Sequence, residues 1–460
     1  MAQAGAQGVA GAPNPPAAIS CESKTRAISA GGVGEDDARG VTVDAEGAAY
    51  VAGYISAPAV FGGSEIRPEG RTDAYLAKYA SDGALQWLKR LGGAGEDAAY
   101  AVAVAGGAVY VAGVFDHRVL YDGTAFTPSP ERRWFLGKFS SAGSSEWMRE
   151  LRAVDDAAVS ITPRGLAVAA DGSAYVVGEF EGAWSWDGHA ITAQGPGDIF
   201  VAHFNPAGVL DWARRAGGLG FDGARGVAVI ADGSAYVTGS YLGEGPYEEG
   251  RSFTTVSRHF LAKYGADGRL HWAKMDTREE AAGSSEGYSV ATIPDGSVYV
   301  AGSLSGSVAF DDGAHAAVTS DGSNVFLAKY AGDGSVLWVR AGRSDLGAQS
   351  AIYAVAALPN ASVYLVGGSL GGVQFGGHRL GNIHAWTMFM GRVRGDGEVS
   401  WVRESRPFNP SDSSTGRAVA VRDDCIGYVA GAFVNTWSID GASVTARGSS
   451  DAFLVQFGPH

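Results

Sequence analysis

Short runs in which every second residue is hydrophobic recur along the whole chain and predict β-strands. One run is Val-Thr-Val at residues 41–43, and a second, Tyr-Val-Ala-Gly at residues 50–53, follows after a tight turn. Alternation with a period of two residues is the mark of a strand, because successive side chains point to opposite faces. Seven copies of the second run occur, 60 to 65 residues apart, beginning at Tyr50, Tyr110, Tyr175, Tyr236, Tyr299, Tyr364 and Tyr428. This regular spacing indicates a repeat architecture.

Each repeat contains four predicted strands, which we name A to D in chain order. Strands A and B are the two runs just described, and turns such as Ala-Asp-Gly-Ser at residues 170–173 join them as a hairpin. Strand C is an apolar run such as residues 260–264, and strand D carries a tryptophan with a cation two residues later. We expect these tryptophans to pack between neighbouring repeats; they are Trp87, Trp147, Trp212, Trp272, Trp338 and Trp401.

Four antiparallel strands in each of seven repeats predict an all-β fold, a seven-bladed β-propeller of four-stranded antiparallel blades. A lone sheet with two apolar faces cannot cover itself, whereas sheets stacked around an axis cover one another. The seventh repeat ends at Phe457 without a tryptophan strand, and residues 24–30 lie where a strand D is expected. We therefore expect this N-terminal strand to complete the last blade and close the ring, which removes an open sheet edge.

Composition and charge divide the chain and limit its partners. Residues 1–22 are rich in Ala, Gly and Pro and predict a disordered tail, whereas residues 23–460 predict the propeller. The tail has neither the basic start nor the apolar centre of a signal peptide. The net charge of −14 argues against a nucleic-acid partner. No apolar run approaches the ~20 residues of a transmembrane segment, and we expect a monomer.

The repeat resembles the seven-bladed β-propeller repeat (SBBP repeat) family of bacterial proteins, which are often secreted or at the cell surface. The motifs that carry the resemblance are Gly-Gly-x-Gly-Glu-Asp at 31–36 and 92–97, Asp-Gly-Ser-Ala-Tyr-Val at 171–176, and Phe-Leu-Ala-Lys-Tyr followed by Gly-x-Leu-x-Trp. The resemblance covers essentially residues 24–457. It implies the propeller fold and an extracellular or cell-surface location, and it implies no catalytic residue. Quinoprotein-type propellers share a similar Gly-x-Leu-x-Trp element, but with shorter spacing and usually eight units.

One position of the repeat carries long side chains with polar tips, two residues before each strand A. Because strand A is innermost in a propeller, these side chains are expected at one mouth of the central channel. Asp36, Asp97 and Asp222 lie three residues earlier and could pair with them or cap the turn. The position therefore predicts either a network that locks the linkers or a site for an anion or a sugar, which Arg and Tyr both suit. Its residues are Arg39, Tyr100, Arg164, Arg225, Tyr288, Tyr353 and Arg417.

The loops between strands B and C are the most varied part of the repeat and are expected on the same face as this mouth. Trp134 and Trp184 break the repeat pattern there, as does the His384–Trp386 pair. Binding sites are usually built from loops on one face of a rigid scaffold, so we predict that Trp134 and Trp184 contact a ligand together with the mouth residues. The opposite face carries mostly short Asp-Gly turns with little surface to vary.

Motifs for catalysis are absent from the sequence. It has no His-Glu-x-x-His, no Gly-x-Ser-x-Gly and no phosphate-binding glycine loop, so we expect no metal and no cofactor. Our first hypothesis is a non-catalytic binding or scaffold propeller that contacts a glycan or a protein through the B–C loop face. The alternatives are an enzyme, such as a lyase or hydrolase at the channel mouth, and a spacer without a ligand. The near-equivalence of the blades disfavours an enzyme, because catalysis needs unlike groups to converge.

The two cysteines, Cys21 and Cys425, are predicted to form a disulfide. Cys21 lies just before the closing strand, and Cys425 lies in the A–B turn of the seventh repeat. In a four-stranded antiparallel blade, this turn and the start of strand D lie at the same end. The alternative is two free thiols, whereas a disulfide would indicate an oxidising compartment.

Overall fold

The computed structural model describes residues 24–116, 120–121, 124–125, 133–151, 160–186, 188–242, 257–276, 283–310, 318–345, 347–382, 384–422 and 426–458. All regular secondary structure in these ranges is β-strand, so the expected all-β fold is confirmed. Within the same ranges no helix is long and apolar enough to cross a membrane.

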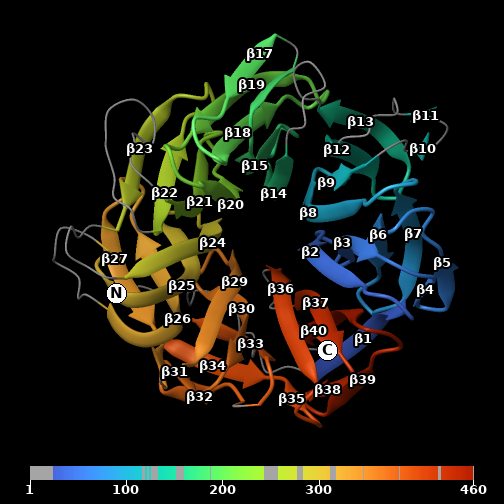
Figure 1. Ribbon diagram of the computed structural model, residues 1–460, viewed down its shortest axis with the longest axis vertical. Helices are drawn as coiled ribbons and strands as arrows, with labels where there is room; N and C mark the ends of the chain where they lie inside the picture. Colours follow the sequence, from blue (N-terminus) through green and yellow to red (C-terminus); the bar gives the residue numbers. More distant parts are fainter. Residues whose placement is uncertain are drawn as a thin grey trace, which may run out of the picture.

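Seven groups of four antiparallel strands lie around a common axis, and the first strand of each group is nearest the axis (Figure 1). The strands that match strand A are β2 (Asp37–Val43), β8 (Ala98–Ala105), β14 (Ile161–Val168), β20 (Gly223–Val229), β24 (Ser284–Thr292), β29 (Gln349–Ala357) and β36 (Ser413–Val421). Those that match strand B are β3 (Ala49–Ile55), β9 (Ala108–Phe115), β15 (Ala174–Phe180), β21 (Ala235–Tyr241), β25 (Val298–Val308), β30 (Val363–Leu370) and β37 (Gly427–Val434).

The outer two strands of each group complete the sheets, which we number one to seven in this order. Strand C is β6 (Asp73–Tyr79), β12 (Arg133–Ser140), β18 (Asp198–Phe204), β22 (Arg258–Tyr264), β26 (Val318–Tyr330), β33 (Thr387–Val393) and β40 (Asp451–Gly458). Strand D is β7 (Leu85–Leu91), β13 (Ser145–Leu151), β19 (Leu210–Ala216), β23 (Leu270–Met275), β27 (Val336–Ala341), β34 (Val399–Glu404) and β1 (Lys24–Gly32). Each innermost strand contacts that of the next sheet, and β36 contacts β2.

Short strands decorate the connections between the main strands. Most form hairpins between strands B and C, and β28 and β35 pair with the hairpins of sheets six and seven. They are β4 (Ala59–Phe61), β5 (Ser64–Ile66), β10 (Leu120–Tyr121), β11 (Thr124–Ala125), β16 (Ala183–Trp186), β17 (His189–Thr192), β28 (Arg343–Ser344), β31 (Val373–Phe375), β32 (His378–Leu380), β35 (Arg406–Pro407), β38 (Thr436–Ile439) and β39 (Ala442–Thr445). A single parallel bridge, Ser323 to Gln349, joins sheets five and six.

The N-terminal strand pairs with the C-terminal strand, as expected from the missing tryptophan strand. In β1, residues 24–30 lie antiparallel to β40, with Thr25 opposite Phe457 and Ala30 opposite Ala452. Gly31 and Gly32 continue β1 into a pairing with β4 of the first repeat. The first residues described in the chain therefore bridge its last and first repeats.

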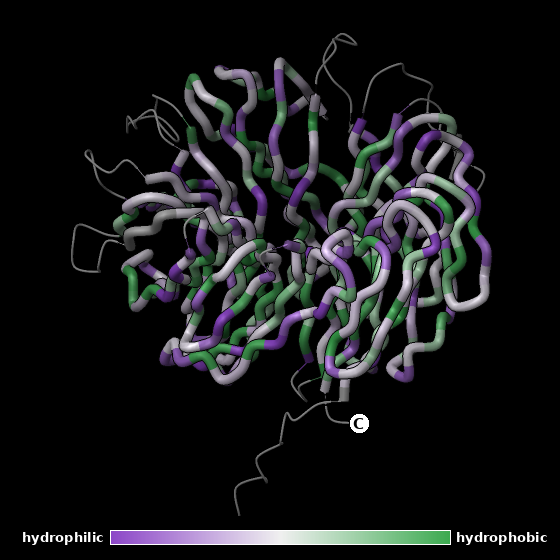
Figure 2. The backbone as a smooth tube through the Cα atoms, turned by 60° about the horizontal axis from the view of Figure 1, so that its bottom comes forward, coloured by the Kyte–Doolittle hydropathy of each residue, from purple (hydrophilic) through white to green (hydrophobic). Residues whose placement is uncertain are grey.

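Apolar side chains fill the space between neighbouring sheets. One core cluster combines Tyr50 and Leu76 of sheet one with Val111 and Phe135 of sheet two. Figure 2 shows hydrophobic stretches running along strands in the interior of the body. Because both faces of a sheet are covered in this way, the second strands read as nearly continuous apolar runs.

The strand-D tryptophans contact the next sheet, which confirms their predicted packing. Trp212 donates its indole N–H to the carbonyl of Ala266 at 2.9 Å, and Arg214 donates from Nε to the carbonyl of Gly268 at 2.9 Å. The Arg214 guanidinium also lies 5.5 Å from the Trp212 ring centroid. Trp338 and Arg340 make the same bonds to Gly395 and Gly397. The cation two residues after the tryptophan thus belongs to a clamp between sheets.

Candidate ligand-binding site

Each of the seven mouth residues is the extra residue of a β-bulge. In β2 the register passes from Ala38 opposite Gly53 to Gly40 opposite Ala52, which leaves Arg39 outside the ladder. The same irregularity occurs once in every innermost strand, at Tyr100, Arg164, Arg225, Tyr288, Tyr353 and Arg417. A bulge bends its strand and changes the direction of a side chain. One backbone device therefore presents one long side chain per sheet.

These bulges gather their side chains around one central cavity. The cavity has a volume of about 180 Å³, and its lining includes Arg39, Tyr100, Arg164, Arg225, Tyr288 and Tyr353. Arg417 is not part of this lining, although its neighbour Ala418 is. Six of the seven residues expected together therefore line one cavity, and ligand binding there stays a prediction.

Three of the four mouth arginines pair with carboxylates that the repeat pattern did not reveal. Asp37 lies 2.7 Å from Nε of Arg39 and 2.9 Å from Nε of Arg417, so it connects sheets one and seven. Glu179 lies 2.6 Å from Arg164. Burial raises the pKa of Asp37, although the charges of Arg417 and Arg39 oppose this shift.

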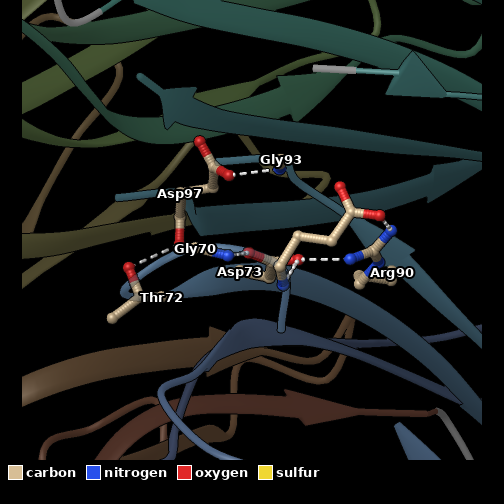
Figure 3. Close-up of polar contacts among 7 residues, drawn as sticks. Gly70, Thr72, Asp73, Arg90, Gly93 and Asp97 are labelled. Atoms are coloured by element: carbon tan, nitrogen blue, oxygen red, sulfur yellow. Dashed lines mark hydrogen bonds and ion pairs between the residues drawn. The ribbon is translucent and has the colours of Figure 1, made fainter. Parts of the chain in front are cut away.

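The linker aspartates Asp36, Asp97 and Asp222 take the other role foreseen for them, that of turn caps. Asp97 accepts a hydrogen bond from the backbone N–H group of Gly93 at 2.6 Å (Figure 3). It accepts a second from the backbone N–H group of Asp116 at 2.9 Å. Asp36 accepts from Gly32 and Ser56, and Asp222 accepts from Gly218 and Leu242. Their carboxylates are thus committed to the linker backbone.

Arg225 differs from the other mouth arginines. Arg39, Arg164 and Arg417 each form an ion pair with a carboxylate. Among the described residues, the Arg225 guanidinium forms no ion pair, and its buried Nε atom has no hydrogen-bond partner. Its neighbours in the ring are Arg164 on sheet three and Tyr288 on sheet five. The charge of Arg225 is therefore available to a ligand.

A second cavity opens beside the two tyrosines of sheets five and six. Its volume is about 390 Å³, and it shares Tyr288 and Tyr353 with the central cavity. The two rings lie 5.3 Å apart between centroids, at 60°. Tyr288 donates its hydroxyl hydrogen to Glu286 at 2.7 Å, and burial, followed by the charge of Glu286, raises the pKa of Tyr288. The remaining lining is Ser303, Gly322, Ser323, Gly347, Ala348, Gln349, Ser350, Ala351 and Trp386.

Small residues in sheet six make room for this cavity. The position two residues before the bulge holds Asp37 in sheet one, Thr162 in sheet three and Glu286 in sheet five. Thr162 lies opposite Glu179 of the neighbouring strand. In sheet six the same position holds Ala351, which lies opposite Gly368. A Cβ atom on Gly368 would lie 2.2 Å from Nε1 of Trp386. The indole therefore rests on bare backbone, and the sequence signal for it was the unusual His384–Trp386 pair.

Two predicted contact residues are corrected by their burial. Trp134 is 0% exposed and Trp184 is 1% exposed, and both belong to the core between sheets two and three. Their rings lie 5.6 and 6.3 Å from that of Phe200. They break the repeat pattern because they fill space beneath the loops, and they present no surface to a ligand.

The opposite end of the molecule also contains a cavity, contrary to the expectation of little variable surface there. It measures about 770 Å³ and lies among the A–B and C–D turns of sheets one and two. The turn of sheet two is short, with Gly106 and Gly107 at φ of 58° and 78°. Three polar residues of this cavity pair with one another: Asp44 accepts from the Tyr50 hydroxyl at 3.0 Å and lies 3.7 Å from Lys78.

Several sequence predictions lie outside the described residues. These are the tail at residues 1–22 and both cysteines, Cys21 and Cys425, so their disulfide stays a prediction. Among the residues that are described, no group of three or more His, Cys, Asp or Glu side chains could hold a metal ion.

Comparison with known proteins gives no family assignment. No protein-family profile and no curated protein matches the sequence. Similar solved structures include a protein of unknown function from Bacteroides caccae, with a TM-score of 0.34, 12% identity, and coverage of 71% of this chain and 89% of the other. A GH43 protein from Bacillus licheniformis has a TM-score of 0.29 and 9% identity over 94% of this chain and 98% of its own. A quinonprotein alcohol dehydrogenase-like protein from Bacteroides thetaiotaomicron has a TM-score of 0.29 and 10% identity over 91% and 96%. At such low scores these likenesses carry no argument, and the function must be argued from the residues of the chain itself.

Proposed function

We propose that this protein is a closed seven-bladed β-propeller that binds a glycan or a protein through its B–C loop face, without catalysing a reaction. The observation that carries the proposal is the set of seven β-bulges that hold four arginines and three tyrosines, six of which line the central cavity. Bulges are common next to binding sites, where they re-aim a side chain, and binding sites are usually built at one face of a rigid scaffold.

Three contacts support the closed ring. The strand β1 pairs with β40, β36 contacts β2, and Asp37 of sheet one holds Arg417 of sheet seven. We assign residues 23–460 to the propeller and residues 1–22 to a tail. We further propose that the chain is a monomeric relative of the SBBP repeat family that acts outside the cell or at its surface, as the resemblance implies.

The pairing of the mouth carboxylates supports a binding protein over an enzyme. Asp37 is held by two arginines and Glu179 by one, which lowers their use as general acids or bases. One observation favours the alternative, a lyase or hydrolase: Glu286 and Tyr288 form a 2.7 Å acid–phenol pair beside the 390 Å³ cavity. Release of soluble products from a bound glycan over time would establish this second function.

A glycan array and a pull-down from cell-surface protein test the binding function. We expect the charge reversals Arg164→Glu and Arg225→Glu to weaken binding at least tenfold. Gln86→Ala, which alters the cavity at the opposite end, serves as the control and should leave binding unchanged. Melting curves of all three variants separate loss of binding from loss of folding, because Arg164 also pairs with Glu179. Binding that depends on Gln86 and not on the mouth arginines would contradict the proposal.

A further inference from the structure

The unpaired guanidinium of Arg225 sets a requirement on the ligand. A buried N–H group without a partner is unfavourable, and Arg225 Nε is such a group among the described residues. A carboxylate can bond a guanidinium through two parallel N–H···O bonds, which are among the strongest hydrogen bonds in proteins. The complement of Arg225 is therefore a planar anion of the size of a carboxylate.

The 390 Å³ cavity sets a second requirement. Its volume lies within the range of small-molecule sites, and none of the described residues that line it carries a charged side chain. The rings of Tyr288, Tyr353 and Trp386 offer apolar faces, while Ser303 and Gln349 offer hydroxyl and amide groups. This combination suits the C–H face and the hydroxyl groups of one or two sugar rings.

The two cavities lie on either side of a shared wall. Tyr288 and Tyr353 line both cavities, and Arg225 lines the central one. The innermost strands of sheets four and five approach closely at this point, because a Cβ on Gly226 would lie 3.0 Å from the Cα of Ser289. Arg225 and Tyr288 are consequently neighbours in the ring, on adjoining strands.

We propose that the ligand is an acidic glycan whose sugar ring occupies the cavity of Tyr288, Tyr353 and Trp386 and whose carboxylate pairs with Arg225. This inference rests on the proposed function, since it names the ligand class of the same mouth. The chemical class is a uronic-acid-containing oligosaccharide.

The charges around the mouth favour an acidic sugar over a neutral one. Four arginines, Arg39, Arg164, Arg225 and Arg417, face three carboxylates, Asp37, Glu179 and Glu286, which leaves one positive charge. Asp37 and Glu179 are neutralised by the other three arginines, and Glu286 accepts the hydrogen bond of Tyr288. The whole chain carries a charge of −14, so only the charges at the mouth attract an acidic sugar. Salt screens this attraction, and binding should therefore weaken as the salt concentration is raised.

Matched sugars test the proposal by titration calorimetry. The probes are uronic-acid-containing oligosaccharides and their carboxyl-reduced forms, which keep every linkage and lose only the charge. We expect the wild-type protein to bind at least one acidic form about tenfold or more tightly than its reduced form. Arg225→Gln should abolish this preference, whereas Trp386→Ala should weaken both forms. Arg269→Gln, an arginine 84% exposed in a C–D turn, is the control and should change neither.

The outcomes distinguish this proposal from the function on which it rests. Equal affinity for acidic and reduced forms, a preference that persists in Arg225→Gln, or no binding of any uronate overturns the acidic-sugar proposal. If the protein then binds a neutral glycan or a protein, and Arg164→Glu weakens that binding, the proposed function survives. Binding that no mouth variant alters overturns both. Should Arg225→Gln fail to fold, Arg225→Lys keeps the charge without the paired N–H groups and is expected to show a reduced preference.

Discussion

At the scale of single residues, the linker aspartates show how a repeat can hold buried charge. Asp97 is 0% exposed, and its neighbour Asp73 is also buried. Asp73 accepts from the backbone N–H groups of Glu69 and Gly70 and from Arg90 at 3.1 Å (Figure 3). Burial raises the pKa of Asp97 from 3.8 to about 7, against the effect of its two backbone donors. Asp36 and Asp222 have pKa values of about 6 for the same reason.

These raised pKa values predict how stability depends on pH. The folded protein holds the Asp97 proton more tightly than the unfolded chain does. The contribution of this proton to the free energy of unfolding is therefore fully present below about pH 4 and is lost as the pH rises to about 7. The asparagine in Asp97→Asn does not ionise, so this variant does not lose stability from that position as the pH rises. We therefore expect the melting temperature of Asp97→Asn to lie furthest below that of the wild-type protein at pH 5, with a smaller difference at pH 8.

A matched aspartate provides the control for this pH measurement. Asp333 lies in an exposed turn, where hydrogen bonds from the side chain and backbone of Ser335 lower its pKa. It stays ionised throughout this range, so the effect of Asp333→Asn on the melting temperature should be the same at pH 5 and pH 8. An Asp97→Asn effect that is equally independent of pH would show that Asp97 does not titrate there.

The sequence identified the mouth residues, and it missed their partners for a physical reason. Arg39 and its equivalents recur at one position in all seven repeats, so the period alone brings them together. Asp37, Glu179 and Glu286 occur in only three sheets and from two different strands. Trp134 was misplaced because a large aromatic in a varied segment can fill the core as well as contact a ligand, and alternation does not separate the two.

At the scale of strands and turns, alternation predicted the strands but concealed the bulges. A bulge inserts one residue, and the residues on both sides of it still alternate, so the pattern looks unbroken. The signal lies in the following residue, which is small in every sheet: Gly40, Ala101, Gly165, Gly226, Ser289, Ala354 and Ala418. These small residues allow neighbouring innermost strands to approach closely. A long residue followed by a small one at the start of strand A could have located the bulges.

The turns that contact tryptophans yield a prediction about coupling between sheets. Gly268 and Gly296 both have left-handed backbones, with φ of 76° and 83°. A Cβ on Gly268 would lie 2.6 Å from the Trp212 ring, whereas a Cβ on Gly296 would have no heavy atom within 4 Å. Ala at either position costs about 1–2 kcal/mol for its backbone. We expect Gly268→Ala to cost a further 1–3 kcal/mol or so, because the clamp must shift.

Chemical denaturation measures this difference, with Gly296→Ala as the matched control. Equal destabilisation by the two substitutions would mean that the Trp212 clamp contributes nothing beyond the conformation of the turn. A larger loss in Gly268→Ala that disappears in a Trp212→Ala background would assign the effect to the indole directly, since the two changes would then be coupled.

At the scale of the whole molecule, the first and last described strands, β1 and β40, pair in sheet seven, and the predicted disulfide concerns the same sheet. A Cys21–Cys425 bond would join the segment before β1 to the A–B turn of that sheet. Loop-closure models give about 4–5 kcal/mol for a bond that encloses so long a segment. We expect mass spectrometry of unreduced protein, made under oxidising conditions, to find the two cysteines linked. Two free thiols in such material would disprove the bond.

The closing strand provides the last prediction. In β1, Ala30 is buried, and Ile28 packs against the core that joins sheets seven and one. Deletion of residues 1–30 would remove the β1–β40 pairing and expose the edge of β40. We expect this deletion to lower the melting temperature by roughly 5 °C or more and to promote association through the open edge, visible by light scattering. Deletion of residues 1–20 should change little, because it keeps β1 intact and removes few apolar side chains. Both proteins should be measured under reducing conditions, so that a disulfide at Cys21 cannot contribute. If the two deletions melt at the same temperature, β1 does not hold the ends of the chain together and the ring is stabilised by contacts between sheets alone.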